Sequence, residues 1–338
     1  MPREEALERA GGRERGGVVS GGACRVSAFM NQKGGVGKTT TVVNLAAAIA
    51  ERGLRVLVVD LDPQAHATLH LGIEPGSLDA SVYDVLLKPS RCADALLEAR
   101  ERLWLLPSIV DLAAVETEIA GDTDRQGRLV HALEGVLGRF EFVLIDCPPS
   151  LGLLTLNGLA ASHEVVVPMQ AHFLALQGVG KLLETVRLVR RGVNPALRVA
   201  GVVLCMHDEN TRHTKEVVAD LEGFFESSRA TDVPWTDARV YRPAVRRNIK
   251  VAESPSFGQT IFEYARWCAG AMDYLQLAEA FSGDAWERES GAEAPSCVRA
   301  DVDDAGADGA RDEAPGDVGE PKIVVREGAG QRSGRLTA

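Results

Sequence analysis

A glycine-rich run near the start of the chain carries two lysines. Residues 31–40 read NQKGGVGKTT, in which residues 37–39 fit the end of the phosphate-binding pattern G-x-x-x-x-G-K-[ST]. Gln32 stands where the first glycine of that pattern falls, and a second lysine, Lys33, opens the run. Glycines let the backbone approach an anion closely and aim its N–H groups at phosphate oxygens. The run therefore predicts a nucleotide-binding loop that has one cation more than such a loop needs.

The side chains of this loop suit separate tasks. Lys38 would reach the β- and γ-phosphates of the nucleotide, the Thr39 hydroxyl would hold Mg²⁺, and Thr40 would donate to the α-phosphate. The loop residues expected to bind the nucleotide are Gly34, Gly35, Val36, Gly37, Lys38, Thr39 and Thr40. A nucleotide with β- and γ-phosphates, together with Mg²⁺, is therefore expected at this loop.

Acidic side chains follow two later apolar runs. VVDLDPQ places Asp60 and Asp62 after one run, and VLIDCPPS places Asp146 after another. Because the carboxyl ends of strands border the ligand crevice of an open parallel sheet, we expect these acids near the loop. Asp146 suits a role as a Mg²⁺ ligand through water, and Asp62 suits positioning of the attacking water. Asp60 either joins this site or caps the local turn.

The elements that must position these motifs alternate along the chain. Near-continuous β-branched runs predict strands buried on both faces, at 25–30, 54–60, 103–107, 140–146, 163–168 and 197–205. Longer amphipathic stretches predict helices at 37–52, 110–120, 124–138, 175–191 and 211–227. This alternation predicts one doubly wound α/β domain with a mostly parallel sheet, the fold class of P-loop NTPases.

Composition sets the limits of that domain. The chain has 338 residues and a net charge of −11. Residues 1–24 and 284–338 have few bulky apolar groups, so we expect a disordered N-terminal extension and an acidic, disordered C-terminal tail around an ATPase domain at 25–283. No stretch approaches the roughly 18 apolar residues of a membrane span. The scattered cysteines suit reduced thiols in a cytoplasm.

Four segments together resemble the ParA/Soj family of partition ATPases, within the deviant Walker A group of P-loop proteins: KGGVGKTT, VDLDPQ, IDCPPSLGLLTLNGL and RRNIKVAESPSFGQTI. The likeness covers roughly residues 25–283. In this group the extra lysine, here Lys33, reaches across a dimer interface to the partner's ATP, as an arginine finger does. The resemblance implies an ATP-dependent homodimer, a catalytic set of Lys33, Lys38 and Asp62, and Asn248 at the adenine. It also implies an ATPase that is weak without its partner.

A basic segment precedes and overlaps the last of these motifs. Residues 239–250, RVYRPAVRRNIK, contain Arg239, Arg242, Arg246, Arg247 and Lys250. Clustered cations bind phosphates without reading sequence, although such a run can equally be a solvated face. The family binds double-stranded DNA non-specifically as its ATP dimer, so the resemblance implies DNA contacts at Arg212, Arg246, Arg247 and Lys250.

The resemblance implies a nucleoid-associated, cytoplasmic partition ATPase whose hydrolysis a ParB-type partner stimulates. A MinD-like positioning ATPase at the membrane surface is the alternative, and it would need a C-terminal amphipathic helix. The ending VVREGAGQRSGRLTA has no apolar stripe for such a helix. An electron-transfer ATPase related to nitrogenase reductase is a third class, which needs paired cysteine ligands, and Cys147 has no evident partner in the sequence.

Four positions depart from the family pattern. Arg246 stands where relatives commonly carry proline before the RN pair, and Asn210 lies near the place of a family arginine. His172 and Gln177 stand where many relatives carry acids. These departures bear on the details of the interface and not on the ATPase assignment.

Overall fold

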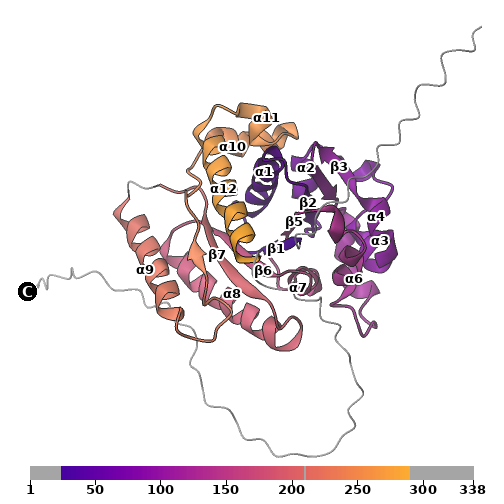
Figure 1. Ribbon diagram of the computed structural model, residues 1–338. Helices are drawn as coiled ribbons and strands as arrows, with labels where there is room; N and C mark the ends of the chain where they lie inside the picture. Colours follow the sequence, from indigo (N-terminus) through magenta and orange to yellow (C-terminus); the bar gives the residue numbers. More distant parts are fainter. Residues whose placement is uncertain (1–23, 209–210, 290–338) are drawn as a thin grey trace, which may run out of the picture.

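The computed structural model describes residues 24–208 and 211–289 (Figure 1). The predicted N-terminal extension at 1–24 lies outside the described residues except for Cys24. The predicted tail at 284–338 lies outside them beyond Glu289. Helix α12 (Ala269–Glu289) continues past the expected end of the ATPase domain at residue 283.

A sheet of eight strands forms the centre of the described part, in the order β3-β4-β2-β5-β1-β6-β7-β8. The strands are β1 (Arg25–Phe29), β2 (Val56–Asp60), β3 (Leu97–Arg100), β4 (Leu103–Leu106), β5 (Phe142–Asp146), β6 (Glu164–Met169), β7 (Arg198–Leu204) and β8 (Arg239–Val240). All neighbouring strands are parallel except β3 and β4, which are antiparallel. The predicted doubly wound, mostly parallel sheet is confirmed, and all six predicted strands form.

Both faces of the sheet are buried, which explains the near-continuous apolar runs. Along β2, Val56 and Val58 face one core while Leu57 and Val59 face the other, and none of the four is exposed. Helices α1 (Lys38–Glu51), α11 (Ile261–Ala265) and α12 cover one face, and α7 (Leu153–Ala160) and α8 (Phe173–Gly192) cover the opposite face (Figure 1).

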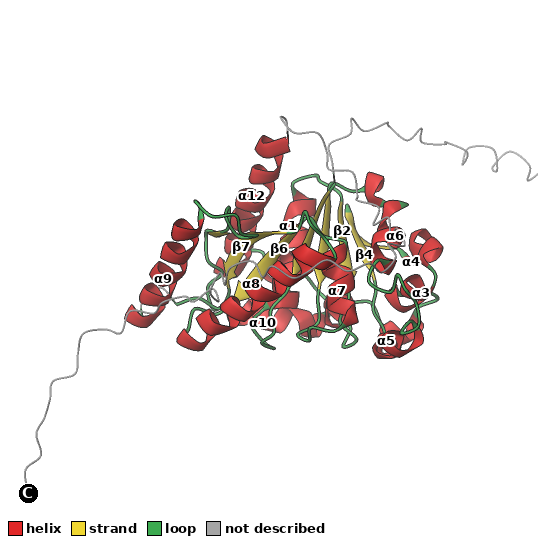
Figure 2. Ribbon diagram, turned by 90° about the horizontal axis from the view of Figure 1, so that it is seen from below, coloured by secondary structure: helices red, strands yellow, loops and turns green. Residues whose placement is uncertain are grey.

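Shorter helices complete the two ends of the sheet. Figure 2 shows α3, α4, α5 and α6 gathered at the β4 end, and α9 beyond β7 at the other end. The remaining α-helices are α2 (His66–His70), α3 (Val82–Leu87), α4 (Cys92–Ala95), α5 (Val115–Glu118), α6 (Arg128–Glu134), α9 (Arg212–Ser228) and α10 (Ile249–Glu253). Single 3₁₀ turns lie at Pro75–Ser77, Pro89–Arg91, Val110–Ala114, Leu137–Arg139 and Ser254–Phe257. In the described part of the chain, none of the helices combines the length and apolarity needed to cross a membrane.

The predicted crossover helices differ in how well they match. Helices α8 and α9 begin and end within two residues of the predicted 175–191 and 211–227. The stretch predicted at 124–138 shortens to α6, because Gly127 and Gly135 stand at its two caps and glycine is a weak helix former. The stretch at 110–120 divides into a 3₁₀ turn and α5.

The C-terminal third contains elements that the sequence analysis did not assign. Helix α12 lies across the sheet beside α1 (Figure 1). Its Phe281 ring is 6.2 Å from the ring centroid of Phe29 on β1, 6.1 Å from that of Phe142 on β5 and 5.7 Å from that of Tyr241. This aromatic cluster anchors α12 over the strands that carry the phosphate-binding motifs.

Candidate nucleotide site and basic segment

The glycine-rich loop joins the end of β1 to the start of α1, as predicted. Gly35 and Gly37 adopt left-handed backbone angles, with φ of +71° and +93°. A Cβ at position 37 would also lie 3.2 Å from the Cβ of Cys205, so this position favours glycine twice over. Within the described part of the chain, no atom outside the neighbouring residues lies within 4 Å of a Cβ built at Gly34 or Gly35. The loop therefore has room for an anion to approach its backbone.

Lys38 and Thr39 converge on Asp146 at the end of β5. The Thr39 hydroxyl donates to Asp146 Oδ2 at 2.6 Å, and Lys38 Nζ lies 3.5 Å from Asp146 Oδ1. Asp146 is fully buried, and burial raises the pKa of its carboxyl while Lys38 and Thr39 oppose that rise. Asp146 Oδ1 has no hydrogen-bond partner among the described residues. A hydroxyl and a carboxylate are oxygen donors that suit Mg²⁺, so these residues fit that ion.

Asp60 and Asp62 differ in what they contact. Asp60 is fully buried and pairs in register with Asp146 across β2 and β5. Its Oδ2 accepts hydrogen bonds from the Thr68 backbone N–H at 2.9 Å and the Thr68 hydroxyl at 2.8 Å. Burial raises the pKa of Asp60 to about 7, and the nearby Asp146 charge adds to the rise. Asp60 therefore holds the local turn, which was one of its two predicted roles.

Asp62 lies at the same carboxyl end of the sheet, with 7% of its surface exposed. Its Oδ1 accepts a hydrogen bond from the Gln64 N–H at 3.0 Å, and its backbone carbonyl accepts one from the Ser108 hydroxyl at 2.8 Å. These bonds fix the backbone of Asp62 beside the loop. Its role in positioning water stays a prediction.

Lys33 is exposed at the outer side of the loop. Its Nζ lies 2.9 Å from Nε2 of His172, a contact in which a neutral imidazole accepts from the ammonium. Partial burial lowers the pKa of His172, and the Lys33 charge lowers it further. The backbone N–H of Lys33 donates to Asn31 Oδ1 at 3.0 Å. The sequence signal for this contact was the departure from the family pattern at His172, but nothing in the sequence indicated its partner.

Three of the four cations expected to bind DNA are paired with acids, and so is Arg242 of the basic segment. The ion pairs are Arg212–Glu216 at 2.9 Å, Arg242–Glu222 at 2.7 Å, Arg246–Asp273 at 2.7 Å and Lys250–Glu253 at 2.9 Å. Arg212 begins α9 and pairs within that helix, whereas the other three lie in the basic segment. Arg247 is exposed, and its side chain has no hydrogen-bond or ion-pair partner among the described residues.

The basic segment runs beside the end of β7. His207 donates from its backbone N–H to the Val245 carbonyl at 2.9 Å, and the Arg247 N–H donates to the His207 carbonyl at 3.3 Å. Two residues before His207, Cys205 contacts the glycine loop at Gly37. Asn248 caps α10, and its Oδ1 accepts from the Lys250 N–H at 2.9 Å. The basic segment is thus bonded to the chain just after β7, where Cys205 Sγ lies 3.3 Å from the Thr41 hydroxyl on α1.

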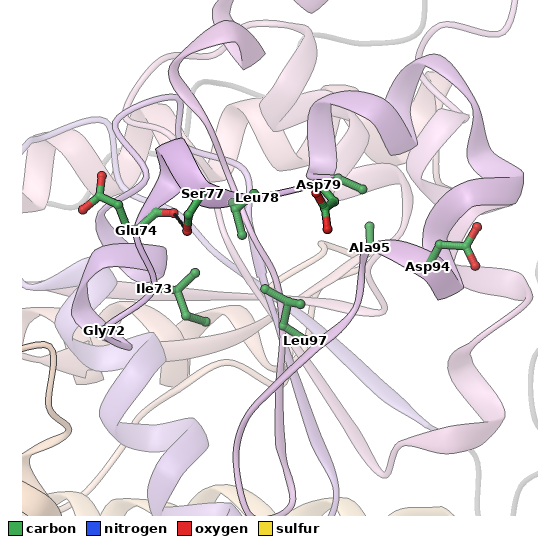
Figure 3. Close-up of a pocket in the computed structure, with 10 residues that line it drawn as sticks. Gly72, Ile73, Glu74, Ser77, Leu78, Asp79, Asp94, Ala95 and Leu97 are labelled. Carbon is green, nitrogen blue, oxygen red and sulfur yellow. Dashed lines mark hydrogen bonds between the residues drawn. The ribbon is translucent and has the colours of Figure 1, made fainter.

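A hollow of about 510 Å³ lies away from these residues, between the segment 72–80 and the start of β3 (Figure 3). The residues that line it include Ile73, Leu78, Asp79, Asp94 and Leu97 (Figure 3). It contains none of the predicted site residues. The candidate site is therefore the glycine loop with its neighbouring acids, and not this hollow.

Comparison with known proteins identifies a matching family and related sequences. Residues 24–199 match the model of a family described as AAA domain. The chain is 41% identical over 256 residues to the sporulation initiation inhibitor protein Soj of Bacillus subtilis, covering 75% of this chain and 97% of Soj. It is 40% identical over 263 residues to the chromosome partitioning protein ParA of Caulobacter vibrioides, covering 77% of this chain and 94% of ParA.

A solved structure matches with a TM-score of 0.65 and 38% identity, covering 78% of this chain and 96% of that one. It is described as cobyrinic acid a,c-diamide synthase from Mycobacterium smegmatis with a bound ATP analogue and magnesium. That name differs from those of the two relatives, while the bound nucleotide and metal agree with the chemistry of the glycine loop.

Proposed function

The chain belongs to the Soj/ParA family of partitioning ATPases, and we propose that it segregates DNA through a cycle controlled by ATP. In this cycle ATP binding produces a sandwich dimer, and the dimer binds double-stranded DNA without sequence preference. A ParB-type partner stimulates hydrolysis and so releases the protein from DNA. The ATPase is weak without that partner, and the protein is cytoplasmic and associated with the nucleoid.

The observation that carries this proposal is the convergence of Lys38 and Thr39 on the buried carboxylate of Asp146. Lys38 and the backbone N–H groups of the glycine loop hold the phosphates of ATP. Thr39 and Asp146 would hold Mg²⁺, which would supply charge neutralisation at the phosphates. Asp62 orients the attacking water. The ATP analogue and magnesium in the structure from Mycobacterium smegmatis support this assignment.

Lys33 supports the dimer. It lies outside the convergence on Asp146, exposed to solvent, and contacts only an imidazole side chain among the described residues. An ammonium group that is not bound to a carboxylate can leave its neighbour for a phosphate of a second subunit. In the proposed dimer Lys33 therefore completes the partner's site, which links the bound nucleotide to the oligomeric state.

The basic segment supports the DNA-binding step. Arg247 presents an exposed guanidinium group with no partner in the described chain, and its backbone N–H donates to the carbonyl of His207, two residues after Cys205, which lies next to the glycine loop. A guanidinium group binds phosphate through charge and bidentate geometry, without reading the bases. This proximity supports DNA binding that responds to the nucleotide.

Sedimentation with and without nucleotide tests the proposal. The wild type is expected to bind a fluorescent ATP analogue with Mg²⁺ and to sediment as a dimer only with that analogue. Lys38→Ala should lose nucleotide binding, whereas Lys33→Ala should bind the analogue and remain a monomer. Lys88→Ala removes an exposed lysine after α3 and serves as the matched control. A wild type that stays monomeric at saturating analogue contradicts the proposed cycle.

A further inference from the structure

A buried acid on α12 holds one residue of the basic segment by four hydrogen bonds. Asp273 is 1% exposed, and its Oδ2 accepts from the Arg246 backbone N–H at 3.0 Å and from Arg246 Nε at 2.8 Å. Its Oδ1 accepts from Arg246 Nη2 at 2.7 Å and Nε at 3.1 Å. Because both the backbone and the guanidinium group of Arg246 are bound, Asp273 fixes the position of the chain at this residue and not only its charge.

One turn earlier on the same helix, Gly270 contacts the next part of the segment. A Cβ built at Gly270 would lie 2.5 Å from Cγ2 of Val251 and 3.3 Å from Cβ of Asn248. Val251 is 8% exposed and its branched side chain has little freedom to move aside. Helix α10 can therefore lie against the backbone of α12 only because position 270 has no side chain.

The result is that residues on both sides of Arg247 are fixed while Arg247 itself is not covered. Asp273 binds Arg246, and the absence of a side chain at Gly270 lets Asn248 and Val251 pack against α12. We propose that Asp273 and Gly270 are positioning residues that seat the segment 246–251 on α12 and so aim Arg247 at DNA. This inference rests on the proposed DNA-binding function. It also gives Arg246 the role of an anchor, in place of the phosphate contact expected from the sequence.

Tyr274, which follows Asp273 on α12, contacts the helix that begins at the glycine loop. ATP affinity must therefore be measured together with DNA affinity. Tyr274 Oη lies 3.5 Å from the hydroxyl of Thr41, whose backbone N–H donates to the Gly37 carbonyl at 2.9 Å. One turn of α12 thus contacts both the basic segment and the helix that begins at the glycine loop. A change at Asp273 can alter the affinity for ATP through Tyr274 or through Asn248, which is expected at the adenine, so DNA binding must be compared at saturating nucleotide.

The charge of Asp273 makes the test decisive. If only net charge mattered, removing an acid beside a DNA-binding surface would strengthen DNA binding. The positioning role predicts the opposite sign. Asp273→Asn and Gly270→Ala should each weaken binding of the ATP-bound dimer to a random-sequence duplex about tenfold, the order of magnitude expected when a phosphate contact is lost in each subunit. DNA affinities are compared at a saturating concentration of the ATP analogue, because Asn248 in this segment is expected at the adenine, and the melting temperature should stay near that of the wild type.

Matched controls exist on the same helix. Gly283→Ala places a methyl group where no atom of the described residues lies within 4 Å, and Glu279→Ala removes an exposed acid. Both should bind DNA at least as tightly as the wild type. Fluorescence anisotropy measures each DNA affinity. Hydrogen exchange of the backbone amides of 246–251 measures, without DNA, how firmly this segment is held against α12. Exchange should be faster in Asp273→Asn and Gly270→Ala.

Two results separate failure of this inference from failure of the proposed function. Unchanged exchange at 246–251, or DNA binding by Asp273→Asn as tight as or tighter than that of the wild type, overturns the positioning role. A wild type that binds no DNA in any nucleotide state overturns the proposed function. In that case, faster exchange in the variants would still show that Asp273 and Gly270 hold residues 246–251 against α12.

Discussion

Replacing Arg247 by alanine should change how DNA binding responds to salt. Arg247 is the exposed cation of the basic segment whose side chain has no partner among the described residues, whereas Arg242, Arg246 and Lys250 are each paired with an acid. A paired cation must exchange its carboxylate for a phosphate, so the pair releases fewer DNA counterions than a cation that is not paired. We therefore expect Arg247 to account for a larger part of the salt dependence than any of these neighbours.

The size of the effect follows from the number of contacts. Each neutralised phosphate contributes about −0.9 to the slope of log affinity against log salt concentration. A dimer carries two copies of Arg247, so Arg247→Ala should flatten the slope by about 1.8. When salt rises from about 50 mM to about 200 mM, the wild type should then lose roughly twelvefold more affinity than the variant loses.

Fluorescence anisotropy with a random-sequence duplex and a non-hydrolysable ATP analogue measures this slope. Arg229→Ala is the matched control, because Arg229 is exposed at the end of α9 and pairs with Glu226. Arg242→Ala should flatten the slope less than Arg247→Ala, since Arg242 is paired with Glu222. Sedimentation must first show that each variant forms the ATP dimer. If Arg247→Ala forms the dimer and keeps the wild-type slope, the guanidinium group does not contact phosphate.

Three further predictions concern the nucleotide site. Asp62→Ala should hydrolyse ATP at least about tenfold more slowly while remaining a dimer on DNA, because water positioning is lost and phosphate binding is not; normal turnover, measured by phosphate release, would place this role elsewhere. His172→Ala should leave ATP affinity unchanged and should not prevent dimerisation, because Lys33 needs only to leave this neighbour; a variant that stays monomeric in sedimentation would show that His172 takes part in the interface. Because the folded protein holds the pKa of Asp60 at about 7, above its ordinary value, the stability that protonation gives is present at low pH and is lost as pH rises through about 7. Without nucleotide, the melting temperature should therefore fall as pH rises from about 4 to about 7 and change little from this cause above pH 7, and it should fall less in Asp60→Asn; equal slopes for the two proteins over that range would refute the assignment.

The sheet could be predicted because its signal is local. Runs such as VLVVD on β2 are buried on both faces, and a continuous apolar run of that length is typical of a parallel strand. Strand β8 has two residues, too few to leave a pattern. Helix α12 packs among several elements, and a buried acid, Asp273, interrupts its apolar side chains. A helix of that kind shows no simple apolar stripe, which is why the sequence did not reveal it.

The nucleotide site could also be predicted from local spacing. The glycines, Lys38 and Thr39 lie within one loop, and Asp146 ends a strand that must border the same crevice. The partners of Lys33 and Arg246 could not be predicted in this way. His172 lies 139 residues from Lys33, and Asp273 lies 27 residues from Arg246. Only the folded chain brings them together, so the sequence showed cations but not which of them are already bound.

The central claim is that the nucleotide controls DNA binding, and one titration tests it most directly. The wild type is added to a labelled random-sequence duplex in three conditions: with a non-hydrolysable ATP analogue and Mg²⁺, with ADP and Mg²⁺, and with no nucleotide. The account predicts tight, salt-sensitive binding only with the ATP analogue, because only that state forms the dimer. Equal affinity for DNA in the analogue and in ADP would contradict it.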